Sequence, residues 1–289
     1  MRSEARQPPG FVPADDLSTW LVLGKDGLER RAWLFLPGDA PGPLPVVLCP
    51  HPFGLTALGN LFGETGGHRT LVDIPGITPA ARRHGFAVLT LVAEGLRVTG
   101  GSLGLPTHLD AYVTALREAS EAGAALDLDA VVAAGLSMGG QEAILLGCRH
   151  PDIVRAVAAQ SPVTDLVAWH RHLSALPEGG AHAAAIRTEL GASSDSAPEA
   201  WAERSPSSLA APRLRLQVRL NRLDSLVPAW EQGLAYVRAV VEAGGNVEVV
   251  EDLPAMIDGR DPGRAAHEHV SWDAILQWLH TVLLQRRVA

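Results

Sequence analysis

The chain has 289 residues, of which 47% are hydrophobic and 19% charged, and its formal net charge is −8. This length and composition predict one large α/β domain or two small ones with a sizeable core. The negative charge argues against a nucleic-acid partner, because a phosphate backbone binds basic surfaces. No apolar run approaches the roughly 18 residues that a membrane-spanning helix needs, and residues 1–9 lack the apolar segment of a secretory signal, so we expect no membrane partner.

Cysteine and lysine are informative because they are scarce. Cys49 and Cys148 are too few for a disulfide framework and both fall in apolar segments, so we expect free thiols in a reducing compartment, the cytoplasm. Lys25 is the only lysine, and it lies at a predicted hairpin tip. Schiff-base enzymes, P-loop NTPases and Ser–Lys hydrolases each need a lysine inside the site, so the sequence argues against all three.

The first part of the chain predicts a hairpin followed by buried strands that alternate with helices. Short unbroken apolar runs bounded by Gly and Pro are typical of such strands. The predicted elements are an irregular arm over 1–16, hairpin strands at 17–23 and 29–36, a buried strand at 46–49, a short helix ending at 83–85, a second buried strand at 86–92 and a helix over about 107–122.

The segment Gly135-Leu136-Ser137-Met138-Gly139 follows a further apolar run and precedes an apolar helical pattern. A G-x-S-x-G motif between a strand and a helix predicts a nucleophile elbow, in which the serine sits on a strained turn. The glycines are needed because residues two positions before and after that serine crowd the turn. The N–H of Met138 then lies at a helix N-terminus, where it can stabilise an oxyanion. The alternative is a glycine-rich turn whose serine has no role.

The second part of the chain interrupts the alternation and then resumes it. Residues from about 162 to 212 predict a small cap insertion within a single domain that spans 17–289. The other predicted elements are a strand at 154–160, a strand at 214–220 with one solvated face, a helix from Pro228 with Trp230, Leu234, Val237 and Val241 on one side, a strand at 246–252, and a helix at 271–286 with Trp272, Ile275, Leu279 and Val282 inward. The βαβα order predicts a mostly parallel sheet with helices on both faces.

A serine nucleophile needs a base, and the base needs a carboxylate that holds its tautomer. In open α/β sheets such groups follow the carboxyl ends of strands. Asp224 is therefore the predicted acid, with Asp252 as second choice and an Asx turn or helix cap as the structural alternative. His267, in the predicted loop before the last helix, is the predicted base, and His269 is its competitor.

The loop after the 46–49 strand is expected to supply a second oxyanion donor. Pro52 has no N–H, so the amide of Phe53 is the candidate, with its ring lining the pocket. Phe62, Trp169 and Trp201 are predicted to line the substrate pocket as well, or alternatively to pack the insertion onto the sheet. The sequence has no HExxH or paired CxxC spacing and no dinucleotide fingerprint, so we expect no metal and no cofactor.

The order Ser137, Asp224, His267 resembles that of the α/β-hydrolase superfamily, whose triad runs in the same order. The resemblance implies an α/β-hydrolase fold with these three residues as the triad. It spans about residues 29–286.

Further segments are similar to the prolyl-oligopeptidase and dienelactone-hydrolase branch of that superfamily. Pro52 and Asn221 stand where that branch usually has glycine. The similar segments are Leu48–Gly54 (its oxyanion loop), 94–102 (its D-x-R-G-x-G-x-S loop), Ser205-Pro206, Asn221–Pro228 and Gly244–Glu248.

These observations predict a cytoplasmic serine hydrolase that cleaves a carboxylic ester of a small-molecule substrate through a covalent acyl-enzyme. A peptidase, thioesterase or acyltransferase would use the same triad, so these activities remain alternatives. An alternative of another class is a non-catalytic ligand-binding protein on the same fold. The sequence leaves the oligomeric state open.

Overall fold

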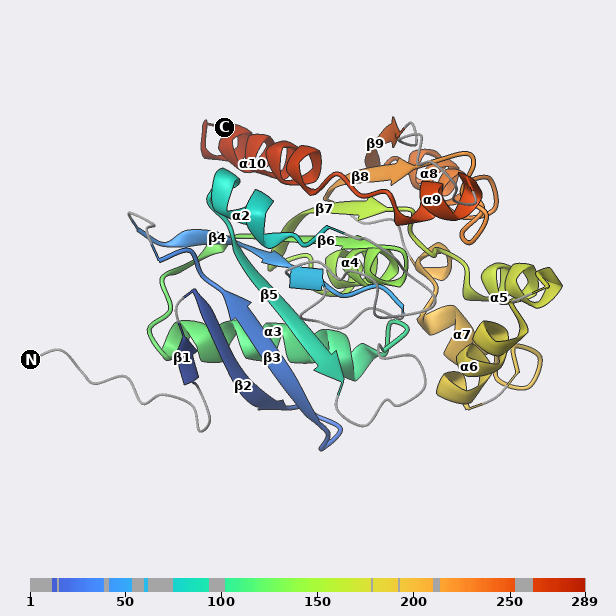
Figure 1. The fold of residues 1–289 in the computed structure, drawn as a ribbon, viewed down its shortest axis with the longest axis horizontal. Helices are drawn as coiled ribbons and strands as arrows, with labels where there is room; N and C mark the ends of the chain where they lie inside the picture. The colour runs from blue at the N-terminus through green and yellow to red at the C-terminus, as the bar shows by residue number, and fades with distance from the viewer. Residues whose placement is uncertain are drawn as a thin grey trace, which may run out of the picture.

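A computed structural model describes residues 12–14, 16–38, 42–53, 60–61, 75–93, 102–177, 179–191, 193–209, 214–252 and 262–288. Within these residues, one nine-stranded sheet runs through the molecule with helices packed on both faces (Figure 1). Among the described helices, none combines the length and the apolarity that crossing a membrane requires.

The sheet is antiparallel at one end and parallel across the rest. The strand order is β1-β2-β3-β5-β4-β6-β7-β8-β9; β1, β2, β3 and β5 pair antiparallel, and every pairing from β5 to β9 is parallel. This confirms the predicted mostly parallel sheet. The strands are β1 Val12–Ala14, β2 Leu17–Leu23, β3 Glu29–Phe35, β4 Leu44–Leu48, β5 Ala87–Ala93, β6 Leu126–Leu136, β7 Val154–Gln160, β8 Arg215–Leu220 and β9 Asn246–Glu251.

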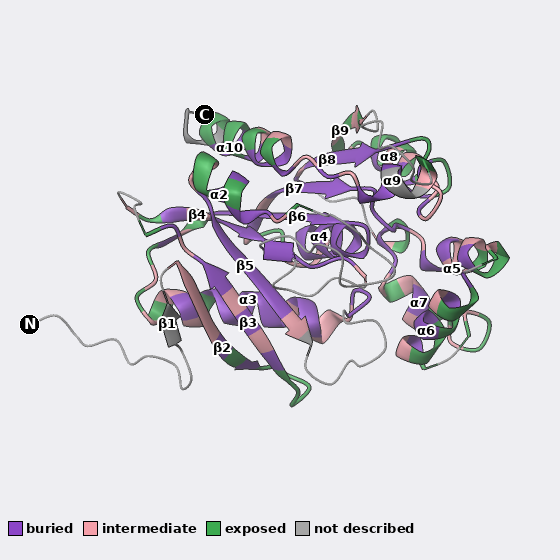
Figure 2. Ribbon diagram, in the orientation of Figure 1, coloured by how far each residue is buried: buried purple, intermediate pink, exposed green. Residues whose placement is uncertain are grey.

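Two hydrophobic cores lie on opposite faces of the sheet. Side chains of α3, α4 and α8 pack in one core, and those of α2 and α10 in the other. Strand β7 contributes to both cores and β8 to the first, and both strands are buried (Figure 2). The helices are α2 Thr78–His84, α3 Pro106–Glu121, α4 Met138–Arg149, α5 Leu166–Ala175, α6 Gly180–Leu190, α7 Pro198–Glu203, the 3₁₀ turn η1 Pro206–Ser208, α8 Gly233–Glu242, α9 Pro262–Glu268 and α10 Trp272–Val288.

Helices α5, α6 and α7 occupy the predicted insertion and lie together beside the sheet, in yellow and orange in Figure 1. Their apolar side chains form a third cluster, which includes Trp169, Ile186 and Trp201. Met138, the first residue of α4, belongs to the same cluster. Helices α5 to α7, the predicted cap, are therefore packed directly against the start of the helix that follows Ser137.

The hairpin and the closing helix agree with the sequence prediction. Strands β2 and β3 pair in register from Leu17 with Phe35 to Leu23 with Glu29. In α10 the four side chains predicted to face inward, at 272, 275, 279 and 282, are all buried. In the predicted irregular arm, Val12–Ala14 form β1, and residues 1–11 and 15 lie outside the described part.

The prediction of a solvated face on β8 was wrong. Gln217 and Arg219 are buried, because β8 lies between β7 and β9 under helices rather than at an exposed face. Their polar groups are satisfied across the sheet: Gln217 Nε2 donates to Glu248 Oε1 at 3.0 Å, and Arg219 Nη2 donates to Asp252 Oδ1 at 2.5 Å. A buried strand whose polar side chains are paired thus has the same alternation of apolar and polar residues in its sequence as a half-exposed strand.

The start of α8 and part of its inward face also differ from the prediction. The helix begins at Gly233 rather than Pro228, because the backbone of Gln232 (φ −113°, ψ −95°) is not helical. Leu234 and Val237 pack against the core as predicted, beside the buried Tyr236 and Val240. Trp230 lies before the helix and is 61% exposed, and Val241 is 58% exposed.

Candidate active site

Ser137 lies between the end of β6 and the first residue of α4, as the elbow motif predicts. Its φ of 58° and ψ of −120° form a conformation that non-glycine residues rarely adopt. Three backbone hydrogen bonds hold this turn: Ser137 N donates to Gln160 O at 2.9 Å, and Gln141 N and Val163 N donate to Ser137 O at 3.0 Å and 3.3 Å. The strained conformation is therefore fixed from both the neighbouring strand and the helix.

Two glycines permit the close packing around this serine. A Cβ on Gly135 would lie 2.2 Å from Gly139 O, inside the turn itself. A Cβ on Gly139 would lie 2.2 Å from Pro50 O, in the segment that follows β4. The turn therefore needs both glycines, and the segment after β4 lies directly against the elbow.

The strand register brings the polar groups after β6, β7 and β8 to one edge of the sheet. Leu136 pairs with Gln160, and Gln160 pairs with Arg219, so the residues that follow these strands are neighbours. Asp224 lies four positions after the last residue of β8 and is buried. Parallel strands thus place the predicted nucleophile and acid on the same edge.

Asp224 uses its two carboxylate oxygens for different purposes. Oδ1 accepts the N–H groups of Leu226 (2.9 Å) and Val227 (2.8 Å), which is the Asx turn considered as its structural alternative. Oδ2 is 2.8 Å from Nδ1 of His267, and the two side chains are 1% and 4% exposed. The same carboxylate therefore shapes its own loop and orients an imidazole.

His267 lies in a short helix, α9, rather than in the predicted loop. One turn earlier, Gly263 O accepts Ser225 N at 3.3 Å, and a Cβ on Gly263 would lie 2.6 Å from Ser225 Cβ. Residues four apart share one helix face. The face of α9 that contacts the segment Asn221–Pro228, which carries Asp224 and is called the acid loop below, therefore also holds His267. His269 lies just beyond α9 and is half-buried.

Asp252, the second choice for the acid, has a different partner. Its oxygens accept from Arg219 Nη2 at 2.5 Å and Nε at 3.2 Å, and both side chains are at most 10% exposed. This is a two-point, nearly buried ion pair between the ends of β8 and β9. Its geometry is that of a structural contact.

Asn221, which stands where the resembling branch has glycine, begins the acid loop with an Asx turn of its own. Its Oδ1 accepts Leu223 N at 3.0 Å, and its φ is not positive. The position therefore has no need for the conformational freedom of glycine.

The candidate oxyanion donors lie on the two segments that meet at the elbow. Met138 is fully buried at the first position of α4, where its N–H has no partner within the helix. Phe53 lies three residues after Pro50 and is half-buried, with its ring centroid 5.3 Å from that of His182 in α6. Donation by the Phe53 amide stays a prediction.

The aromatic residues predicted to line the pocket are placed differently from one another. Trp201 is fully buried and Trp169 is 5% exposed. Both belong to the third hydrophobic cluster, formed around α5, α6 and α7. Trp201 therefore packs within this cluster, which also includes Met138 of α4. Phe53 is half-exposed at the edge of that cluster, and Phe62 lies outside the described residues.

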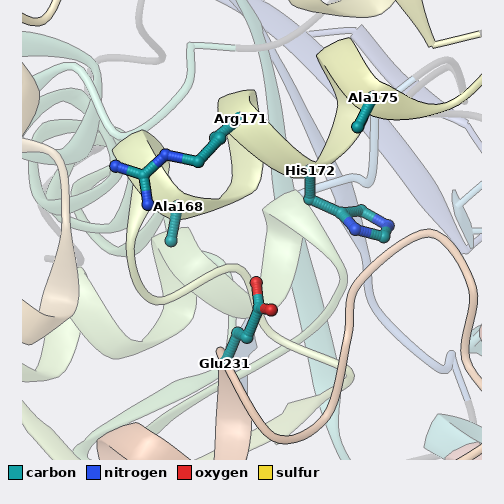
Figure 3. Close-up of a pocket in the computed structure, with 5 residues that line it drawn as sticks. All are labelled: Ala168, Arg171, His172, Ala175 and Glu231. Atoms are coloured by element: carbon teal, nitrogen blue, oxygen red, sulfur yellow. The ribbon is translucent and has the colours of Figure 1, made fainter.

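A cavity of about 510 Å³ opens between α5 and the turn that precedes α8 (Figure 3). Its lining consists of Ala168, Arg171, His172, Ala175 and Glu231, and includes none of the predicted triad. It lies beside the loop that carries Asp224, because its lining residue His172 contacts Ser225 O through Nε2 at 2.8 Å. The contact between Asp224 and His267, rather than this cavity, therefore defines the candidate active site.

Two polar residues of α4 were not singled out from the sequence. Glu142 Oε1 accepts Ser102 Oγ at 2.6 Å and Gly104 N at 3.1 Å, and burial raises the pKa of this carboxyl. Gln141 Nε2 donates to Arg204 O at 2.6 Å, in the cap. The signal available in the sequence is a Gln-Glu pair at the start of an otherwise apolar helix.

The described residues contain no group of three or more His, Cys, Asp or Glu side chains that could hold a metal ion.

Known proteins provide a comparison for the fold. Two similar solved structures are Pyrococcus horikoshii acylaminoacyl peptidase (TM-score 0.64, 14% identity, 94% of this chain and 42% of that one) and puromycin hydrolase (0.63, 19%, 94% and 40%). A third is 2,6-dihydroxy-pseudo-oxynicotine hydrolase (0.64, 16%, 92% and 68%). This chain has the α/β-hydrolase fold.

The α/β-hydrolase fold that the sequence predicts is thereby confirmed. A family model described as "Putative esterase" matches residues 107–247, which hold the elbow and the acid. No curated protein matches the chain. The chain spans 42% and 40% of the first two structures named above, and at these identities the likeness shows the fold.

Proposed function

We propose that this chain is a serine hydrolase that cleaves a carboxylic ester of a small-molecule substrate through an acyl-enzyme. The observation that carries the proposal is the buried contact of 2.8 Å between His267 Nδ1 and Asp224 Oδ2. It occurs at the same sheet edge as a serine on a strained elbow turn. The match to the "Esterase" family and the hydrolase fold support the same conclusion.

In this mechanism Asp224 holds His267 with Nδ1 protonated, so that Nε2 is free to accept a proton. Ser137 Oγ attacks the ester carbonyl carbon while Nε2 takes the hydroxyl proton. The imidazolium then gives that proton to the leaving alkoxide oxygen, which departs as an alcohol and leaves an acyl-serine. Water attacks the acyl-serine in the same way, and the carboxylic acid and free Ser137 are the products.

The N–H groups of Met138 and Phe53 stabilise the tetrahedral oxyanion in this proposal. Each such donor is worth about 3–4 kcal/mol of activation free energy. Met138 is suited to this role because α4 begins there, where the helix dipole also favours negative charge.

Hydrolysis of activated esters tests the proposal. The wild-type chain should release p-nitrophenol from short-chain p-nitrophenyl esters. Ser137→Ala and His267→Gln should each lower kcat by several orders of magnitude, because nucleophile and base act as a unit. His269→Gln is the matched control, and it should stay close to wild type. Turnover that survives Ser137→Ala would overturn the proposal, and loss with His269→Gln but not His267→Gln would reassign the base.

The peptidase alternative is favoured by one comparison, since an acylaminoacyl peptidase shares the fold. Matched ester and amide substrates with one acyl group separate the two activities, and we expect the ester to have the higher kcat/KM. A ligand-binding protein would instead bind such compounds without turnover, with or without Ser137.

We also propose a cytoplasmic location. Cys49 and Cys148 are not joined in a disulfide, which suits a reducing compartment. Burial raises the pKa of Cys49 to about 12 and that of Cys148 to about 11, so neither thiol is a nucleophile at neutral pH. Cell fractionation tests this location, and recovery in the exported fraction would contradict it.

A further inference from the structure

Helix α5 of the cap contacts the acid loop through two polar side chains. Trp169 Nε1 donates to Leu226 O at 3.0 Å, and His172 Nε2 lies 2.8 Å from Ser225 O. A carbonyl oxygen only accepts, so His172 carries a proton on Nε2 and donates it. Residues three apart lie on one helix face, so one face of α5 binds two consecutive carbonyl groups.

The two peptide groups that accept from α5 are the same two that donate to Asp224. The peptide joining Ser225 to Leu226 accepts from His172 through its C=O and donates to Asp224 Oδ1 through its N–H. The peptide joining Leu226 to Val227 accepts from Trp169 and donates to the same oxygen. Two parallel chains of hydrogen bonds therefore run from the cap, through the backbone, to the carboxylate.

We propose that Trp169 and His172 are positioning residues for the triad acid, which they hold through these two peptide groups. The inference rests on the proposed function, since it assigns them to the orientation of Asp224 toward His267. Each donor polarises its peptide group and strengthens the N–H that reaches Oδ1. With Oδ1 held at two points, Oδ2 is aimed at His267 Nδ1.

Helix α5 is itself fixed at its beginning, so it can act as a rigid support. Gln232 is fully buried, and its Oε1 accepts Thr164 N at 2.8 Å and Asp165 N at 2.9 Å. Asp165 then caps α5 by accepting Ala168 N at 3.0 Å. Trp169 and His172 therefore meet the acid loop from a helix anchored to the turn before α8, beside the cavity of Figure 3.

Two substitutions remove the donors and keep most of the side-chain volume. Trp169→Phe and His172→Leu should each lower kcat for an activated ester by about 10- to 100-fold with little change in KM, because a small misplacement of a catalytic group costs about that much. His172→Gln, whose amide N–H can donate, should recover part of the loss. Trp20→Phe is the matched control. Trp20, on β2, is buried like Trp169, and its Nε1 donates to Glu118 Oε2 at 2.9 Å. It should lower Tm and leave kcat unchanged.

A double-mutant cycle separates positioning of the acid from general destabilisation. In an Asp224→Ala background, Trp169→Phe should cause less than a twofold further loss of kcat/KM. A full additional loss in that background, or wild-type kcat in both single variants, would overturn the inference.

The low-field proton resonance of the His267–Asp224 hydrogen bond, recorded by NMR, gives a readout that needs no substrate. We expect it to broaden or disappear in Trp169→Phe and to persist in Trp20→Phe. An unchanged resonance in both Trp169→Phe and His172→Leu would overturn the inference. If the wild type hydrolyses no ester while the resonance responds in this way, the proposed function fails and the positioning of Asp224 still stands.

Discussion

Ser137 has a strained backbone conformation, and hydrogen bonds to its own backbone groups maintain it. Its positive φ persists because Gln160 O and Gln141 N bind its own N–H and C=O. Gly139 lets the segment at Pro50 approach the same turn. Because Gly139 has no Cβ, the turn that holds Ser137 can contact the segment from which the second oxyanion donor is expected.

Gly139→Ala is expected to lower activity more than stability. The new Cβ would lie 2.2 Å from Pro50 O and 3.0 Å from Pro50 C, which are backbone atoms that must shift together with the segment after β4. Displacement of one oxyanion donor predicts a fall in kcat of about 10²–10³-fold. Ester kinetics and Tm measure both effects. Gly180→Ala, where a Cβ meets nothing within 4 Å, is the control and should retain wild-type kcat.

At the scale of elements, the segments that follow β8 and β9 each carry an aspartate with little solvent exposure and a different partner. Asp224 accepts from an imidazole and two amides, whereas Asp252 accepts from a guanidinium. Removing one partner of a buried ion pair lowers the free energy of unfolding by about 3–5 kcal/mol. Removing the acid of a triad instead removes the group that holds the correct imidazole tautomer.

The same substitution at these two positions should therefore have opposite consequences. Asp224→Asn should lower kcat by about 10⁴-fold with a modest change in Tm, because its amide presents N–H to a ring nitrogen that also carries hydrogen. Asp252→Asn should reduce the free energy of unfolding by about 3 kcal/mol and leave kcat of the folded enzyme near wild type. Urea unfolding and ester kinetics on both variants decide the matter, and the reverse pattern would make Asp252 the acid.

The structure explains which elements the sequence could predict. Hairpin β2–β3 and helix α10 have one buried face each, so their apolar period survives in the sequence. Strand β8 has two buried faces with paired polar side chains, and α8 starts late because Gln232 binds the cap; both depend on partners more than 25 positions away. Sequence patterns carry local information, and such contacts are not local.

The candidate site follows the same division. Ser137 has a local motif, and Asp224 has a position relative to a strand that topology makes meaningful. The roles of Trp169 and His172 depend on where the cap meets the acid loop, and no local pattern encodes that. Their spacing of three on a helix is the single available signal.

For the whole molecule, one buried histidine links stability to pH. His108 is 1% exposed and its Nδ1 accepts Arg30 Nε at 3.2 Å; burial first, and then the charge of Arg30, lowers its pKa to about 3. The unfolded chain takes up a proton there near pH 6.5, whereas the folded chain does not until about pH 3. Stability should therefore fall with decreasing pH in this window, by at most about 1.4 kcal/mol per pH unit from this residue.

His108→Gln should flatten that dependence, since its amide oxygen can still accept from Arg30 but takes up no proton. Urea unfolding at several pH values between 6 and 4.5 measures the difference in slope between variant and wild type. His280→Gln, on the exposed side of α10, is the control and should keep the wild-type slope. Equal slopes for His108→Gln and wild type would contradict the assignment.

The most direct measurement is covalent labelling by a fluorophosphonate, followed by mass spectrometry of the peptide that spans β6 and α4. The wild-type chain should gain one adduct, on Ser137, and His267→Gln should react far more slowly although it remains folded. A folded wild-type protein that gains no adduct, or gains it on another residue, would contradict the assignment of Ser137 as the nucleophile.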